Sequence, residues 1–136
     1  CTEASPAAGV WHIGVRAYSS FSNVTLSVSY TTGGTQTNQG FTETGLSASS
    51  SNWLFRTVDV NVPGDTMTVN ISGSNGDADV YVRYGAAPTT SSWDYRPYQW
   101  GSNETVTVNN AQTGTWHIGV RAYSTFSGLT LDVDFN

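Results

Sequence analysis

The 136-residue chain contains no lysine, one cysteine, one methionine and four prolines, and it has no long apolar run. Its five basic residues are all arginine, against ten carboxylates, which gives a formal net charge of -5. A nucleic acid is therefore not an expected partner, because phosphate binding needs clustered positive charge. Without a stretch of roughly 18 or more apolar residues, the sequence predicts no membrane-spanning helix.

The sequence also lacks the short motifs of common catalytic sites. It contains no G-x-S-x-G, no H-E-x-x-H and no glycine-rich phosphate loop. Serine, histidine and aspartate are all present, but in a serine-rich chain their presence alone indicates little. The sequence predicts a protein that is not an enzyme.

Residue types that favour strands and turns dominate what is present. Thr, Ser, Val, Gly and Asn are abundant, aromatic residues make up 12% and charged residues 11%. Apolar residues recur two apart, as in half-buried strands, over residues 53–61, 66–73, 79–84, 104–109, 115–123 and 128–135. We expect an all-β fold, an antiparallel two-sheet β-sandwich that is jelly-roll-like, with about eight strands, the remaining ones short or irregular.

One side of these runs is apolar and predicts the core. The expected core residues are Met67, Val69, Ile71, Trp116, Ile118, Val120, Ala122, Leu129, Leu131, Val133 and Phe135.

An internal repeat predicts the domain organisation. The stretch GVWHIGVRAYS at residues 9–19 returns as GTWHIGVRAYS at 114–124, and 15 of 22 positions agree between residues 9–30 and 114–135. We interpret residues 1–30 as the C-terminal hairpin of a truncated preceding repeat, 31–40 as a polar linker and 41–136 as one complete domain.

The single cysteine has two interpretations. Cys1 aligns with Val106 of the complete copy, so its disulfide partner would belong to the missing part of the first copy, as in an oxidising extracellular setting. A free N-terminal thiol left by a cut is the alternative.

An ordered series of motifs resembles a known family. The series comprises residues 76–85 (GDADVYVRYG), 87–90 (APTT), 96–98 (RPY), 103–105 (NET), 114–116 (GTW) and 120–124 (VRAYS). Residues 41–136 are similar to the bacterial pre-peptidase C-terminal domain. The resemblance implies a secreted, non-catalytic β-sandwich appended to a bacterial hydrolase, chiefly a subtilisin-like protease or metalloprotease. Such domains often occur in tandem and are often cleaved off after secretion, and relatives on clostridial collagenases bind collagen.

Two positions depart from the family pattern. Many members have a cysteine pair where this chain has Tyr95 and Val106, so the complete copy lacks that disulfide. The calcium site of the collagenase relatives lies in an acidic linker, whereas residues 33–44 of this chain offer only Glu43.

Four aromatic residues within eight positions are the candidate ligand-binding site. Trp93, Tyr95, Tyr98 and Trp100 would form a flat face that stacks on sugar rings or grips proline-rich collagen, with Arg96 as a polar anchor. Tyr123 would extend this face. The alternatives are that some of the four rings cap the end of the sandwich, and that Tyr123 packs in a hairpin corner.

Asp77 and Asp79 are candidate calcium ligands, because alternate carboxylates can converge on one cation. The alternative is structural: Asp79 accepts hydrogen bonds from nearby backbone or Arg83, and Asp77 supports a turn. We expect no cofactor other than this possible calcium ion.

These observations predict a secreted, extracellular module that binds an insoluble polymer, such as collagen or a polysaccharide, on behalf of a parent hydrolase. A second hypothesis is a homo-oligomer that exchanges strands or forms filaments through residues 1–30. A third is a secretion or maturation segment that is cleaved off.

Overall fold

The computed structural model describes residues 13–16, 18, 22 and 37–136. The chain divides into two units, Cys1–Thr32 and Gly33–Asn136. In the first unit the described side chains of Ile13, Val15 and Tyr18 are exposed. Most of the predicted hairpin at 1–30, most of the predicted linker and Cys1 lie outside the described residues. Within the described part of the chain, no helix is long and apolar enough to cross a membrane.

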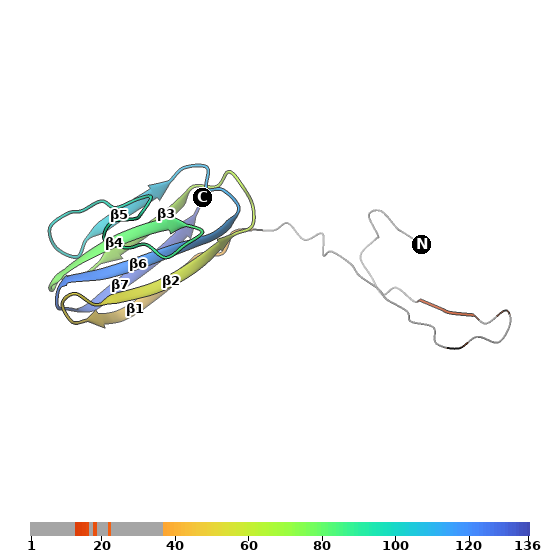
Figure 1. The fold of residues 1–136 in the computed structure, drawn as a ribbon, viewed down its shortest axis with the longest axis horizontal. Helices are drawn as coiled ribbons and strands as arrows, with labels where there is room; N and C mark the ends of the chain where they lie inside the picture. Colours follow the sequence, from red (N-terminus) through yellow and green to blue (C-terminus); the bar gives the residue numbers. More distant parts are fainter. Residues whose placement is uncertain (1–12, 17, 19–21, 23–36) are drawn as a thin grey trace. The chain divides into compact units, whose positions relative to one another are not determined.

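Seven antiparallel strands form the described part of the second unit, in two layers (Figure 1). A four-stranded sheet has the order β1-β7-β3-β5, and a three-stranded sheet has the order β2-β6-β4. The strands are β1 (Phe41–Ala48), β2 (Trp53–Val60), β3 (Met67–Ser72), β4 (Asp77–Tyr84), β5 (Glu104–Val108), β6 (Gly114–Ser124) and β7 (Phe126–Phe135). The predicted all-β two-sheet sandwich is confirmed.

The strand order is that of a jelly roll in which the eighth strand is reduced to a single bridge. In an eight-stranded jelly roll a further strand would pair with the free side of β4. Here Tyr95 takes that place through an isolated antiparallel bridge to Val82. The described residues therefore contain seven strands where about eight were expected.

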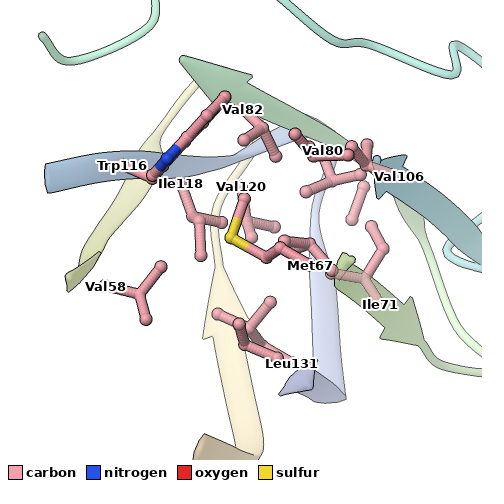
Figure 2. Close-up of a cluster of buried hydrophobic side chains, with 14 of the residues drawn as sticks. Val58, Met67, Ile71, Val80, Val82, Val106, Trp116, Ile118, Val120 and Leu131 are labelled. Carbon is pink, nitrogen blue, oxygen red and sulfur yellow. The ribbon is translucent and has the colours of Figure 1, made fainter. Parts of the chain in front are cut away.

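The core lies between the sheets and consists of the residues that alternation predicts. Met67, Val69 and Ile71 of β3 are fully buried, and in β6 Ile118 alternates with the half-buried His117. Figure 2 shows side chains of both sheets meeting in this layer, with Met67 between Ile71 and Val120. Of the predicted core residues only Phe135, at the end of β7, remains half-buried.

The connection between β4 and β5, residues 85–103, covers the free edge of β4. The carbonyl of Val82 accepts hydrogen bonds from the Asp94 and Tyr95 amides at 3.0 Å each, and the Val82 amide donates to the Tyr95 carbonyl at 2.9 Å. The Tyr84 amide donates to Asp94 Oδ2 at 2.8 Å. Since edge strands with unpaired amides invite pairing with other chains, this connection protects the edge.

The same connection also reaches the outer face of the three-stranded sheet. Gly119 of β6 lies between Phe55 and Tyr81 of the neighbouring strands. A Cβ atom at Gly119 would lie 2.9 Å from Pro88 Cγ and 2.9 Å from Trp53 Cζ3, so both side chains rest on this glycine. Pro88 and Tyr81 are buried, which makes the region beneath residues 85–103 a second packed layer.

Candidate functional site

A small pocket forms where the β4–β5 connection passes the start of β4 and the end of β6. Its volume is about 100 Å³, and its lining residues are Asp77, Asp79, Tyr98, Gln99, Trp100 and Tyr123. Asp77 is opposite Ser124 in the β4–β6 pairing, which brings the end of β6 beside the start of β4. Residues 98–100 come from the covering connection. The pocket thus joins two sets of residues that the sequence suggested separately, the two carboxylates and part of the aromatic cluster.

Three aromatic side chains of the pocket are strongly exposed. The exposed fraction is 92% for Trp100, 62% for Tyr98 and 52% for Tyr123. Large exposed aromatic rings that gather at one place are unusual on a protein that has no partner there. The exposure of Tyr123 does not match the alternative in which it packs in a hairpin corner.

Trp93 and Tyr95 do not line this pocket. The Tyr95 ring centroid is 6.3 Å from that of Trp116, which in turn is 5.3 Å from Tyr84. Tyr95 therefore packs beside the end of the sandwich core, as the capping alternative describes, with 37% of its surface exposed. Trp93 is 42% exposed, and it is not among the residues around the pocket.

Arg96 is held between aromatic rings and a carboxylate. Its guanidinium carbon is 3.7 Å from the centroid of the Tyr98 ring and 4.7 Å from that of Tyr81. Its Nη2 is 3.5 Å from Asp79 Oδ2. Because stacking and ion pairing fix its head group, Arg96 positions Tyr98 at the pocket.

Asp79 is the buried charge beneath the pocket. Its Oδ2 is 3.8 Å from Arg121 Nη1 in addition to the contact with Arg96, and its side chain is only 3% exposed. Burial raises the pKa of Asp79 above its ordinary value, and the neighbouring Arg96 guanidinium opposes that rise. The partners of Asp79 are these two arginines, whereas Arg83 donates to the Ala87 carbonyl at 3.3 Å.

Glu104 fixes the connection that carries the pocket's aromatic residues. Its Oε2 accepts the Val80 amide at 2.7 Å and its Oε1 accepts the Gln99 amide at 2.6 Å, and the residue is 2% exposed. Burial raises the pKa of Glu104, while the two amide donors act in the opposite direction. Sequence reasoning did not identify this residue, because the NET motif at 103–105 gives no sign that its glutamate bridges two sheets.

The backbone of Tyr98 has a left-handed conformation, with φ = 57°. Such a conformation is uncommon for a bulky residue and costs on the order of 1–3 kcal/mol. The Gln99 amide bonded to Glu104 helps to hold this turn, and Gly101 with φ = 85° follows it. Strain of this kind tends to occur where a side chain is held for a function.

Three buried polar atoms near the pocket have no hydrogen-bond partner among the described residues. They are Asp77 Oδ1, Tyr81 Oη and Arg96 Nε. Buried polar atoms are usually paired, so this group is an unusual concentration of unmet hydrogen bonds.

A calcium ion at Asp77 and Asp79 would need ligands other than a third acidic side chain of the described residues. Calcium takes about six to eight oxygen ligands, and no group of three or more His, Cys, Asp or Glu side chains that could hold a metal occurs in the described part of the chain. Asp77 and Asp79 share the pocket, but the two arginines engage Asp79. Glu43 is bound by Arg56, with Oε1 2.7 Å from Nε and Oε2 2.7 Å from Nη2.

Comparison with known proteins identifies relatives of this domain. The family model of the bacterial pre-peptidase C-terminal domain matches residues 55–122. Alkaline serine exoprotease A of Vibrio alginolyticus is 42% identical over 96 residues, which cover 71% of this chain and 18% of that protein. A zinc metalloprotease of Helicobacter pylori is 46% identical over 91 residues, covering 67% of this chain and 35% of that protein. The chain thus spans about a third or less of the length of these relatives.

A solved structure agrees with the fold. The solution structure of vEP C-ter 100 is 42% identical to this chain with a TM-score of 0.57, covering 66% of this chain and 88% of that one. Together with the family match and the seven-stranded sandwich, this shows that the chain belongs to the bacterial pre-peptidase C-terminal domain family.

Proposed function

We propose that this chain is a non-catalytic appendage of a secreted bacterial protease and that it retains the enzyme on an insoluble extracellular polymer. The similar regions belong to a serine exoprotease and to a zinc metalloprotease, two enzyme classes with different catalytic chemistry. Because the two enzymes use different chemistry, a domain that occurs in both is better explained by a need that they share than by a part in either reaction. Retention on a solid substrate is such a need.

The observation that supports binding is the gathering of Tyr98, Trp100 and Tyr123 around one pocket. A binding surface presents large, rigid aromatic rings because their burial releases much free energy with little loss of side-chain entropy. The 92% exposure of Trp100 indicates a side chain that contributes nothing to the core. The strained backbone of Tyr98 fits a residue that is held for contact with a ligand.

Co-sedimentation of the purified chain with insoluble collagen, chitin and cellulose tests this proposal. A sample without polymer is the control. We expect pelleting with one class of polymer, and we expect Trp100→Ala to weaken retention about tenfold or more, as for a central aromatic contact. Trp93→Ala is the matched control, because Trp93 belongs to the same connection but does not line the pocket.

Three results would contradict the proposal. Equal losses of retention on the polymer from Trp93→Ala and Trp100→Ala would indicate that the pocket is not the binding surface. Pelleting without any polymer would favour the self-associating hypothesis. No pelleting at all would favour the segment that is cleaved off and discarded. Urea unfolding of each variant would separate lost binding from lost folding.

A further inference from the structure

Asp77 is a carboxylate of the pocket that forms no ion pair with any described residue. Its Oδ1 is buried and has no hydrogen-bond partner among the described residues. The neighbouring carboxylate differs, since Asp79 contacts both Arg96 and Arg121. Asp77 is half-buried and lines the pocket, so a ligand in the pocket meets the accessible part of this side chain. A cationic donor there would gain an ion pair that no arginine already occupies.

The walls of the pocket suit a cation. Tyr98, Trp100 and Tyr123 surround the carboxylates, and the faces of tyrosine and tryptophan rings attract positive charge. The protein already uses this attraction, because the Arg96 guanidinium stacks on Tyr98 and that of Arg121 lies 5.8 Å from the Tyr123 ring centroid. Such contacts stabilise a cation more strongly when they exclude water.

The charge around the pocket also favours a cation. Asp77 and Asp79 line the pocket and Glu104 lies beneath it, bonded to the Gln99 amide, whereas the neighbouring cations are Arg96 and Arg121, so formal negative charges outnumber positive ones. The whole chain carries a formal charge of -5 and has no lysine. A surface potential of this sign draws basic groups toward the pocket and repels acidic ones.

The pocket has room for the end of a basic side chain. Its volume of about 100 Å³ is several times the roughly 10–15 Å³ that one water molecule needs on the same measure. A guanidinium or an ammonium group with its adjoining methylene fits such a space.

We propose that the pocket binds the basic side chain of a protein, with Asp77 as the ion-pair partner and the rings of Tyr98, Trp100 and Tyr123 against the guanidinium or ammonium group. This inference rests on the proposed function and narrows it, because it names a protein rather than a polysaccharide as the polymer.

Titration with small probes tests the pocket directly. N-acetyl-arginine amide is added to the isotope-labelled chain, and the indole N–H signal of Trp100 is followed by NMR. N-acetyl-citrulline amide is the neutral probe of nearly the same shape. We expect saturable shifts with the arginine probe and at least tenfold weaker binding of the citrulline probe. Equal binding of both probes, or no shift of the Trp100 signal with either, would overturn the proposal.

Asp77→Asn tests the ion pair, and it should weaken binding of the arginine probe about tenfold or more. Asp134→Asn is the matched control, because Asp134 is an exposed carboxylate of β7 in the other sheet. If both variants lost the same affinity for the arginine probe, the cause would be the change in overall charge, and this result would contradict a specific role of Asp77. Trp100→Ala provides a second test, since removal of a side chain that is 92% exposed leaves the core intact.

A competition experiment separates this inference from the proposed function. The chain is pelleted with collagen in the presence of the arginine probe or the citrulline probe. Release of the chain from collagen by the arginine probe, but not by the citrulline probe, supports both the proposed function and the basic side chain as ligand. Retention on collagen that neither the arginine probe nor Asp77→Asn reduces leaves the proposed function standing and refutes the basic side chain as ligand. Binding of the arginine probe without retention on any polymer supports the pocket and contradicts the proposed function.

Discussion

Replacement of Glu104 by alanine should destabilise the domain far more than replacement of an exposed glutamate. The change removes both acceptors that Glu104 offers, Oε2 to the Val80 amide at 2.7 Å and Oε1 to the Gln99 amide at 2.6 Å. The Val80 amide is left buried without a partner, at about 1–3 kcal/mol. The Gln99 amide can regain water, so its loss is about 0.5–1.5 kcal/mol. We expect the free energy of unfolding to fall by about 2–4 kcal/mol.

Urea unfolding followed by tryptophan fluorescence would measure this loss. Glu104→Gln should cost less, because the amide oxygen still accepts one hydrogen bond while its NH₂ group faces the other amide donor. Glu43→Ala is the matched control, since the Glu43–Arg56 ion pair is about one third exposed and should contribute less than about 1 kcal/mol. A loss below about 0.5 kcal/mol for Glu104→Ala would refute the role of Glu104 in holding the connection.

Two further predictions concern the outer face of the three-stranded sheet. Gly119→Ala should lower the free energy of unfolding by about 1–3 kcal/mol, because the new methyl group would displace Pro88 and Trp53. Urea unfolding would measure this loss, and an unchanged stability would contradict the close contact at Gly119. The contribution of Asp79 to the free energy of unfolding should fall as pH rises, because burial raises its pKa in the folded protein. The contribution is complete below the ordinary pKa of 3.8 and is lost as pH rises through the pKa of the folded protein. Unfolding of the wild type and of Asp79→Asn between about pH 3 and pH 7 would check this, and a contribution that grows with pH would contradict it.

Alternation of apolar residues was sufficient to predict most strands and the core, but it failed at β1. The six predicted runs correspond to β2–β7. In β1 the pairing with β7 shifts register twice, after Glu43 and after Leu46, and Gly45 has φ = 73°. These irregularities break the period of two, and the strand offers few apolar residues to reveal it. Local pattern therefore predicts regular strands and misses bulged ones.

The candidate site was only partly predictable, because sequence proximity does not determine which way neighbouring side chains point. Residues 93–100 looked like a single aromatic face. The structure divides them, since Tyr95 pairs with Val82 and the left-handed turn at Tyr98 redirects the chain toward Asp77. The burial of Tyr81 and Asp79 on the outer face was likewise hidden, because the connection that follows β4 folds back over them and local alternation does not predict such a return.

Residues 85–103 include some that bond to the backbone of β4 and others whose side chains are exposed, and this difference has a consequence for protein engineering. Asp94 and Tyr95 are committed to the backbone of β4, whereas the side chains of Tyr98 and Trp100 are exposed. Substitution at these two exposed positions leaves the hydrogen bonds along β4 in place, although a change at Tyr98 also removes its stacking on Arg96. Under the proposed function, a library at Trp100 would sample new ligand preferences with the hydrogen bonds of β4 retained, while a library that included Asp94 would mix changes of binding with loss of folding.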